Sequence, residues 1–381
     1  MTDKLYYESS HRKDFEAQVI SCEPEGEGYK VVLDKTVFFP EGGGQYADTG
    51  ILGGVHVLDA QEKDGIIYHY TDGALTPGEI VKGEIDWEKR FESMQQHSGE
   101  HIISGIVHGR FGYNNVGFHL GADYCTMDFD GPITKEQLKE IEEEANRIVY
   151  KNLNIEILYP TKEELKDLTY RSKIEIEGQV RIVNIPGVDI CACCGTHVTR
   201  TGEIGMVKLL SVVKFREGVR MEMLSGKRVL DYLNMVNDQN RQVSMKLSAK
   251  IGETAAAVAR LQDENFRLKG QVNHMFDELC TVEAKNWEGA GSVLLFHEGL
   301  EADQVRRMAD AVMQKCSGCC AVFSANGDGS YKYAIGEQNG DLRQFTKEMN
   351  AALNGRGGGK PFFVQGSVKA SEDEIRQFFR Q

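Results

Sequence analysis

The amino-acid sequence predicts an α+β protein of several domains, and three observations support this fold class. Its 381 residues suggest two to three domains, each long enough to bury a core. Hydrophobic residues make up 41% of the chain and charged residues 27%, as in ordinary globular proteins. The local patterns change three times along the chain. We therefore expect four parts, at residues 1–88, 89–224, 225–285 and 286–381.

The first part, residues 1–88, is rich in short strand patterns and predicts a small β-barrel. The segment YKVVLDKTVFFP is rich in branched and aromatic residues, which favour strands. The segment GVHVLDAQEKDGIIYHYTDG predicts a hairpin with its turn near Asp64 and Gly65. The glycine-rich segment PEGGGQYADTG predicts a turn. About seven short strands in this space would close into a barrel.

The second part, residues 89–224, begins where the pattern becomes helical, after Asp86. Apolar residues recur at helical spacing in FESMQQHSGEHIISGIVHGRFG, which ends in glycines. Thr134 is a good N-cap for a second helix that extends to about Leu153. The alternating segment KIEIEGQVRIVNI then predicts a strand. Helices combined with a sheet indicate an α+β domain.

The third and fourth parts differ sharply in glycine content. Residues 225–283 carry almost no glycine or proline and predict a long helical spacer. Its apolar seam is irregular, which favours a two-helix hairpin or a loose coiled coil over a strict heptad zipper. In the fourth part, strand patterns alternate with helical patterns such as ADQVRRMADAVMQK, which indicates an α/β domain. This domain contains a second glycine-rich loop, NGRGGGKPFFVQGS.

The start of the chain and its composition exclude several protein classes. The first residues have no signal-peptide pattern, and no apolar run approaches the roughly 20 residues that cross a bilayer. We therefore expect a cytoplasmic protein without membrane contact. The net charge of −14 argues against indiscriminate binding to polyanions, although a local basic face can suffice for nucleic acid. Nine cysteines in clusters indicate metal ligands or redox thiols rather than disulfides.

Two pairs of potential metal ligands each have a spacing of four residues. His97 and His101 lie on the predicted helix, where residues four apart share a face. Alone, such a pair is more often solvated or hydrogen-bonded. Cys193 and His197 flank the short segment CGT, and the alternative there is a buried cysteine beside a loop histidine. Together the pairs offer three nitrogens and one sulfur, a complete tetrahedron of the ligand types that favour Zn²⁺.

The combined pattern resembles a known family. HxxxH followed by C-x-G-T-H-V-x-x-T-G-x-I-G, with FFPEGGGQ upstream, is similar to the editing domain of alanyl-tRNA synthetase and of its free-standing relatives, the AlaX proteins. This match runs from about Thr36 to Leu224. GRGGGKPFFVQGS resembles the glycine-rich loop of the C-terminal domain that follows editing in alanyl-tRNA synthetase and also occurs in DHH-family phosphoesterases. The order of parts resembles the long form of AlaX. The family usually has Cys-Gly-Gly-Thr-His, where this chain has Cys194 second.

The resemblance implies a trans-editing hydrolase with one Zn²⁺ per chain. The zinc-binding editing domain would be residues 89–224, and residues 286–381 would be a glycine-rich tRNA-binding domain. The substrate would be tRNA(Ala) mischarged with serine or glycine. We see no room for an ATP-dependent charging domain before the barrel, so we expect hydrolysis of aminoacyl-tRNA and not its synthesis. The helical spacer or the last domain suggests a homodimer.

The resemblance also implies roles for individual residues of the pocket. Thr36 occupies the family position that hydrogen-bonds the seryl hydroxyl, and Gln45 can donate and accept a hydrogen bond. Gly42, Gly43 and Gly44 would let backbone N–H groups approach the substrate closely. Without the resemblance, a strand threonine and a plain turn would be the preferred interpretations.

Other interpretations remain open at this stage. Arg356 and Lys360 of the last glycine-rich loop would be phosphate partners for tRNA. The cluster CSGCC contains a CxxC pair, but core cysteines are the favoured interpretation because no partner pair lies nearby. The same fold could act as a deacylase of another specificity. It could also be a tRNA-binding protein with structural zinc and no catalysis.

Overall fold

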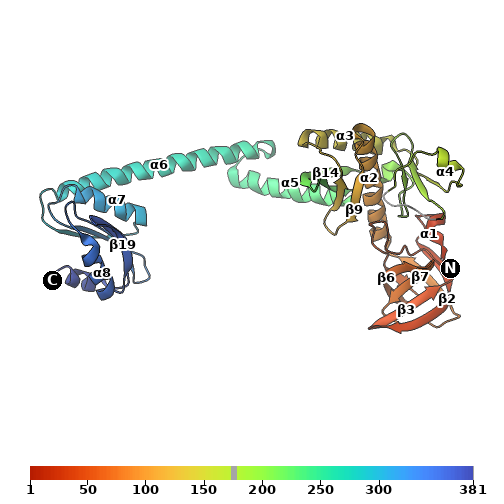
Figure 1. Cartoon of the computed structure of the whole chain (residues 1–381), viewed down its shortest axis with the longest axis horizontal. Coiled ribbons are helices and arrows are strands. Elements are labelled where there is room, and N and C mark those ends of the chain that lie inside the picture. Colours follow the sequence, from red (N-terminus) through yellow and green to blue (C-terminus); the bar gives the residue numbers. More distant parts are fainter. Residues whose placement is uncertain (173–177, 381) are drawn as a thin grey trace. The chain divides into compact units, whose positions relative to one another are not determined.

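The computed structural model describes residues 1–172 and 178–380, and the chain divides into two compact units (Figure 1). The first unit comprises Met1–Gln239 and the second Asn240–Gln381. Both contain helices and sheets, which agrees with a mixed, multidomain fold class. No helix in the described part of the chain is both long enough and apolar enough to cross a membrane.

The N-terminal part of the first unit contains six strands paired in a closed circuit, in the order β2-β3-β7-β6-β5-β8. The strands are β2 (Asp14–Glu25), β3 (Gly28–Leu33), β5 (Gly50–Leu52), β6 (Val55–Lys63), β7 (Ile66–Thr71) and β8 (Ile80–Ile85). Every second residue of β8 is buried, as expected for a strand with one face on a core. The predicted hairpin is confirmed, because β6 and β7 are antiparallel and join through Asp64 and Gly65, at φ of 52° and 76°.

The N-terminus lies against the segment that leads into GGGQ. Strand β1 (Asp3–Lys4) pairs in parallel with β4 (Lys35–Thr36). The short helix α1 (Leu5–Glu8) follows β1 directly. Side chains from the first residues therefore lie next to the predicted pocket.

Two capped helices organise the rest of the first unit. Helix α2 (Trp87–Phe111) begins at Asp86, whose carboxylate accepts a hydrogen bond from the first turn. It ends at Gly112, which has φ of 72°. Helix α3 (Lys135–Lys151) begins at the predicted Thr134 with a full capping box. Both helix predictions are confirmed.

Two sheets pack with these helices, and α2 contacts strands of both. One has the order β14-β15-β10-β9, the other β11-β12-β13. Their strands are β9 (Asn115–Leu120), β10 (Cys125–Phe129), β11 (Glu156–Leu158), β12 (Ile182–Ile185), β13 (Asp189–Ala192), β14 (Val207–Phe215) and β15 (Gly218–Ser225), with α4 (Glu164–Asp167) and the 3₁₀ turn η1 (Thr201–Ile204) between them. The strand predicted over KIEIEGQVRIVNI is found at β12, whereas residues 173–177 of that segment lie outside the described residues.

The predicted helical spacer consists of two successive helices, α5 (Lys227–Leu247) and α6 (Thr254–Asn286), with η2 (Ile251–Glu253) between them. Exposed apolar residues on α6, together with Asn265, form a series in which the spacing alternates between three and four residues. They are Val258, Leu261, Leu268, Val272, Met275, Leu279 and Val282. The seam is therefore regular within α6, contrary to the sequence-based expectation. The interruption between the helices shifts the repeat and made the whole segment look irregular.

The second unit ends in a five-stranded sheet of order β16-β17-β18-β20-β19. Its elements are β16 (Val293–Glu298), α7 (Ala302–Met313), β17 (Cys320–Ala325), β18 (Tyr331–Gly336), α8 (Leu342–Ala352), β19 (Arg356–Lys360), β20 (Phe363–Val368) and α9 (Glu372–Phe378). The predicted alternation of strands and helices is confirmed. Cys316 and Cys320 are buried in its core, as the core interpretation of CSGCC expects.

The glycine-rich segment of this unit is an edge strand and not a loop. Strand β19 pairs antiparallel with β20. A Cβ on Gly357 would lie 2.1 Å from the hydroxyl oxygen of Tyr333, and one on Gly359 would lie 2.3 Å from the carbonyl oxygen of Phe363. The glycines thus permit a close approach to neighbouring atoms. The sequence-based expectation was wrong because glycine is generally depleted in strands.

Candidate metal centre

Helix α2 presents His97 and His101 on one buried face. Their side chains are only 1% and 2% exposed. Gly99 lies between them, and a Cβ there would come within 2.2 Å of the hydroxyl oxygen of Ser225 on β15. Glycine therefore allows α2 to lie close to the sheet.

The turn after β13 brings the other pair to the helix. Cys193 directly follows β13, and its sulfur accepts a hydrogen bond from the backbone N–H of Gly195 at 3.4 Å. A Cβ on Gly195 would lie 2.2 Å from Cε1 of His97. Only glycine lets the turn approach the imidazole so closely. His197 follows two residues later and is 3% exposed.

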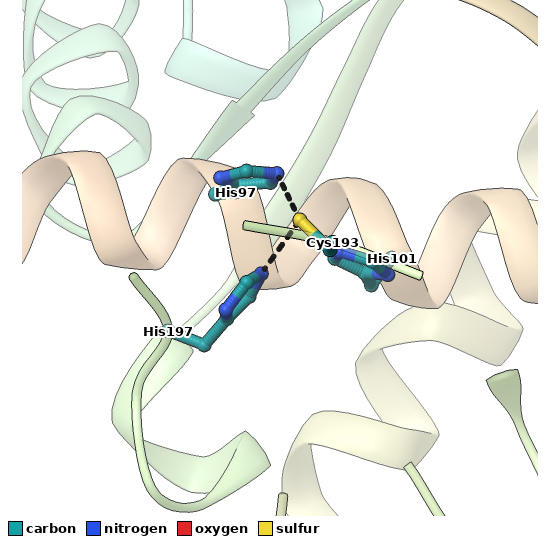
Figure 2. Close-up of side chains that lie close together, drawn as sticks. All are labelled: His97, His101, Cys193 and His197. Atoms are coloured by element: carbon teal, nitrogen blue, oxygen red, sulfur yellow. Dashed lines mark hydrogen bonds between the residues drawn. The ribbon is translucent and has the colours of Figure 1, made fainter. Parts of the chain in front are cut away.

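The four side chains converge on one point (Figure 2). The sulfur of Cys193 lies 3.4 Å from Nε2 of His97 and 3.8 Å from Nε2 of His197. One ligand atom from each of the four residues, His101 included, lies within 4.8 Å of all the others. In a tetrahedral zinc site with bonds of about 2.0–2.3 Å, ligand atoms lie roughly 3.3–3.7 Å apart. The cluster fits a single metal ion.

The hydrogen bonds of His97 and His101 both involve Nδ1, so Nε2 of each ring remains available to bind a metal ion. Nδ1 of His97 bonds to the side-chain oxygen of Gln45 at 3.1 Å, and Nδ1 of His101 bonds to Asp189 at 2.8 Å. Because each acceptor fixes the proton on Nδ1, each Nε2 lone pair is available. Nε2 of His101 is buried and has no hydrogen-bond partner among the described residues. A metal ion would satisfy this atom.

The electrostatics of Cys193 and His197 also suit metal binding. Burial would raise the pKa of the Cys193 thiol, but the three neighbouring imidazoles outweigh burial and lower this pKa well below its usual value. Burial lowers the pKa of His197 to about 3. A thiolate and a neutral imidazole are the forms that bind zinc.

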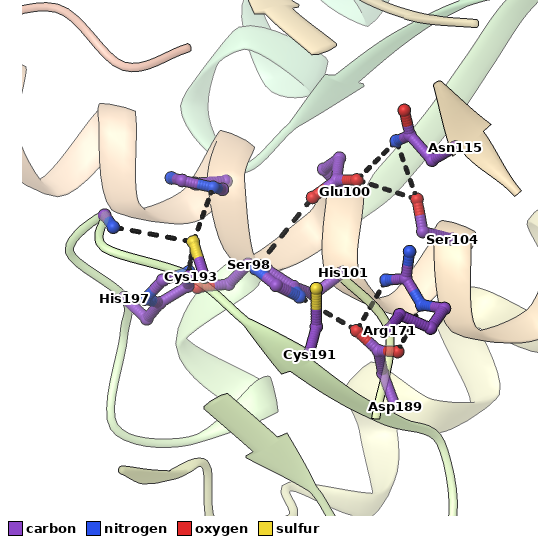
Figure 3. A network of polar contacts seen from close by, with 12 residues as sticks. Ser98, Glu100, His101, Ser104, Asn115, Arg171, Asp189, Cys191, Cys193 and His197 are labelled. Carbon is purple, nitrogen blue, oxygen red and sulfur yellow. Dashed lines mark hydrogen bonds and ion pairs between the residues drawn. The ribbon is translucent and has the colours of Figure 1, made fainter. Parts of the chain in front are cut away.

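A second group of possible ligands, His101, Asp189 and Cys191, adjoins the first (Figure 3). Arg171 donates from Nε and Nη2 to the two carboxylate oxygens of Asp189, each at 2.8 Å. Burial would raise the pKa of Asp189, but hydrogen bonds from His101 and Arg171 lower it. This carboxylate is engaged on both sides, so its role in the structure is to hold His101 in place.

The GGGQ segment adjoins the cluster. Gln45 is buried, bonds to His97, and donates from Nε2 to the hydroxyl of Thr196 at 2.8 Å. Both ends of its amide are thus used to fix residues of the site. Gly43 and Gly44 have φ of 62° and 81°, and a Cβ on Gly43 would lie 3.0 Å from the sulfur of Cys194. Gly42 exchanges two backbone hydrogen bonds with Gln45, which closes the turn.

The hydroxyl of Thr36 makes its hydrogen bonds with His69 of β7 and with Phe38. Thr36 is fully buried, and its hydroxyl is 2.9 Å from Nε2 of His69 and accepts a hydrogen bond from the backbone of Phe38. Thr36 does not line the cavity of about 570 Å³ that opens beside the cluster. Arg356 and Lys360 belong to the second unit, where both are exposed on β19.

A cavity of about 570 Å³ opens beside the cluster. Its wall includes His97, His101, Cys193 and Gly43. Its wall also contains Glu100, whose side chain is 2% exposed and whose Oε2 lies 3.9 Å from Nε2 of His101. The cavity is therefore a space where a ligand could meet both a metal ion and a carboxylate.

Sequence reasoning missed several residues of this site. Glu100 lies within the HxxxH segment, and its carboxylate oxygen Oε1 accepts hydrogen bonds from Ser104 at 2.7 Å and Asn115 at 2.5 Å. Asp189 and Arg171 carry no spacing signal, because the contacts that define them are tertiary. The one signal for Glu100 was an acidic residue on the buried face of a predicted helix.

Three family descriptions match successive parts of the chain. Residues 4–89 match "tRNA synthetases class II (A)", residues 180–227 match "Threonyl and Alanyl tRNA synthetase second additional domain", and residues 289–381 match "DHHA1 domain". These matches follow the order expected from the sequence. The middle match contains Cys193 and His197.

Two curated relatives show the extent of the similarity. The "Alanyl-tRNA editing protein AlaX-L" of Pyrococcus horikoshii is 28% identical over 98% of this chain and 96% of its own length. An "Alanine--tRNA ligase" of Halorubrum lacusprofundi is 32% identical over 96% of this chain, but this chain spans only 42% of that ligase. The solved C-Ala domain of Aquifex aeolicus alanyl-tRNA synthetase is 22% identical over 24% of this chain and 88% of that domain, with a TM-score of 0.22.

The domain order and the end-to-end alignment agree. The three family matches follow one another along the chain, and together they fit a long AlaX protein. The alignment with the editing protein covers nearly all of both chains. The chain is a relative of the AlaX-type alanyl-tRNA editing proteins of the long form.

Proposed function

We propose that this chain edits alanyl-tRNA in trans, by hydrolysing the ester that joins serine or glycine to tRNA(Ala). The observation that carries the proposal is the buried cluster of three imidazoles and one thiol beside a cavity, in a chain similar from end to end to an alanyl-tRNA editing protein. The cavity size lies in the usual range for a small ligand, about 300–1,000 Å³.

We propose Zn²⁺ as the metal, one per chain, held by His97, His101, Cys193 and His197. Mixed nitrogen and sulfur ligands with tetrahedral spacing support zinc over harder ions. Bound there, the ion would act as a Lewis acid toward the ester carbonyl. Gln45 and Asp189 would keep the two helix histidines in the ligating tautomer.

The proposed hydrolysis needs an acceptor for the proton of the attacking water. We assign this role to Glu100, the carboxylate in the cavity wall. The water oxygen bonds to the carbonyl carbon while Glu100 takes a proton. The bond to the ribose oxygen then breaks, and that oxygen takes the proton. Hydrogen bonds from Ser104 and Asn115 hold the carboxylate in place.

The remaining assignments rest mainly on the motifs. Thr36 stays our proposed partner of the seryl hydroxyl, although its own hydroxyl is already shared by His69 and Phe38. Arg356 and Lys360 stay proposed phosphate contacts, supported by their exposure on β19. The division at residues 88, 224 and 285, including a barrel at the start, is supported by the family matches at both ends of the chain.

We further propose that α6 pairs with α6 of a second copy. The exposed seam described above has the heptad spacing of a two-stranded coiled coil, and Asn265 occupies one seam position, where asparagine favours two parallel strands. In parallel pairing, Glu264 of one copy would face Lys269 of the other. The apolar residues Phe276 and Cys280 lie on another face and are buried in the core of the second unit.

A panel of charged tRNAs tests the activity. Release of serine from Ser-tRNA(Ala), with Ala-tRNA(Ala) spared at least about tenfold, is the expected result for a site that recognises a hydroxyl. The Cys193→Ala variant serves as the inactive comparison. Equal release from unrelated charged tRNAs would favour a deacylase of another specificity. Binding of tRNA without any turnover would leave only a structural role for the metal.

A further inference from the structure

We propose that Arg181 binds the 5′-phosphate of the terminal nucleotide of the charged tRNA, in the cavity beside the cluster. Arg181 lines the same cavity as His97, His101 and Cys193. The inference rests on the proposed function and adds an anchoring residue for its substrate.

The guanidinium of Arg181 is held in place by its neighbours. Nη1 donates to the carbonyl oxygen of Cys193 at 2.8 Å, and the group lies 4.9 Å from the ring centre of Tyr7. The hydroxyl of Tyr7 in turn donates to the carbonyl oxygen of Cys194 at 2.9 Å. A charged group anchored in this way loses little entropy when it binds a ligand.

This guanidinium still has an unused donor. Nε of Arg181 is buried and has no hydrogen-bond partner among the described residues. No carboxylate in the described part of the chain forms an ion pair with Arg181, whereas the nearby Lys4 is paired with Glu62 at 2.6 Å. Buried donors are nearly always satisfied, so an unsatisfied one in a cavity wall indicates a missing acceptor.

A phosphate is the acceptor that fits this position. In an aminoacyl-tRNA, the ester and the 5′-phosphate are attached to one ribose, so an ester carbonyl at the metal cluster places the phosphate within one nucleotide of it. Arg181 touches the carbonyl of Cys193, one of the four proposed ligands. Arginine forms strong charge-assisted hydrogen bonds with phosphate oxygens. In a chain of net charge −14, such a local cation would offset the general repulsion of an anionic substrate.

Two stable analogues that differ only in the 5′-phosphate measure the contribution of this contact to binding. Serine is joined by an amide to 3′-amino-3′-deoxyadenosine, with or without a 5′-phosphate, and binding to zinc-loaded protein is measured by calorimetry. The wild-type protein should bind the phosphorylated analogue at least about tenfold more tightly. Arg181→Met should abolish this preference and leave binding of the analogue without phosphate unchanged. Arg181→Lys should keep part of it.

The matched control is Arg147→Met, which removes an exposed arginine of α3 that pairs with Glu143 at 3.9 Å. It should keep the full preference. Because Arg181 also holds the backbone of Cys193, the metal content of each variant is measured as well. Three results would overturn the proposal. Arg181→Met could lose affinity equally for both analogues, or it could keep the preference for the phosphorylated one. The wild-type protein could also bind neither analogue. Serine release from Ser-tRNA(Ala) is assayed separately. Absence of the phosphate preference in a wild-type protein that still releases serine would count against this contact alone, whereas absence of serine release would count against the proposed function.

Discussion

Each helix histidine of the cluster is fixed by one acceptor, Gln45 for His97 and Asp189 for His101. These acceptors select the tautomer that leaves Nε2 free to bind a metal ion. In the structure Gln45 contacts His97 and Thr196, and its predicted contact with the substrate stays a prediction. Asp189 depends in turn on Arg171, which occupies both of its oxygens.

Replacing Asp189 by asparagine should weaken metal binding about 10- to 100-fold, because the charge that orients His101 is lost. Competition with a chelating dye measures the affinity. The matched control is Asp128→Asn, which breaks a similar two-point pair with Arg220 at 2.6 and 2.7 Å. An unchanged metal affinity in Asp189→Asn would contradict the assignment.

Glu100→Gln tests the proton acceptor. The amide keeps the size of the side chain but cannot take a proton, so kcat for serine release should fall about 10²-fold or more while metal content stays the same. Glu92→Gln on the same helix removes the carboxylate that pairs with Arg228 at 2.7 Å and serves as the control. If Glu100→Gln kept the wild-type kcat, another group would have to accept the proton.

At this scale the sequence predicted which four side chains meet, but it did not predict their surroundings. A spacing of four residues is local, so His97 with His101, and Cys193 with His197, could be paired by counting. Glu100 and Asp189 were not predicted, because their roles follow from contacts that form only when the chain is folded. Asp189 meets His101 across 88 positions.

Among the elements, the strand circuit contains a buried histidine that makes stability depend on pH. His69 on β7 is fully buried, and burial lowers its pKa to about 4. The unfolded chain, with a histidine pKa of about 6.5, takes up the proton first as pH falls. Between about pH 6.5 and 4, His69 is therefore neutral in the folded protein and protonated in the unfolded chain, so stability falls as pH falls through this window.

Urea unfolding at several pH values measures this effect. One extra proton in the unfolded state gives a slope of at most about 1.4 kcal/mol per pH unit. The His69→Gln variant should be less stable at pH 7, because it disturbs the contact with Thr36, but should lose this part of the slope. A variant whose slope matches the wild type between pH 6.5 and 4 would refute the assignment to His69.

Helix α6 gives a prediction about association. Leu268→Glu places a charge in the exposed seam and should convert a dimer into a monomer of 42.6 kDa in sedimentation equilibrium. Phe266→Glu is the control, since this residue is 82% exposed but lies outside the seam. A wild-type protein that sediments as a monomer at micromolar concentration would rule out the pairing.

The helices and the hairpin could be predicted because their caps and turns are encoded locally. Other elements could not be predicted, because they depend on tertiary contacts or on a break in a helix. Thr134 and Gly112 mark helix ends that the chain encodes locally. The strand β19 was missed because its glycines are useful only once Tyr333 and β20 lie against them. The seam of α6 was missed because a break in the helix hid its repeat.

For the whole molecule, the resemblance to a long AlaX protein was predictable from the sequence, and the three family matches fit it, whereas the division at residues 88, 224 and 285 stays a prediction. The cluster unites two segments about ninety residues apart, and the cavity next to it combines a metal site, a carboxylate and a cation. Together these groups suit the hydrolysis of an ester carried by an anionic polymer, which is the activity proposed above. The central claim is that this combination hydrolyses a mischarged tRNA and that it depends on one metal ion.

Titration of metal-free protein with Zn²⁺ tests this claim most directly. Serine release from Ser-tRNA(Ala) is followed while zinc is added back to protein treated with a chelator. We predict no release without metal, and full activity at one equivalent of zinc per chain. Undiminished serine release by protein from which all metal has been removed would contradict the account.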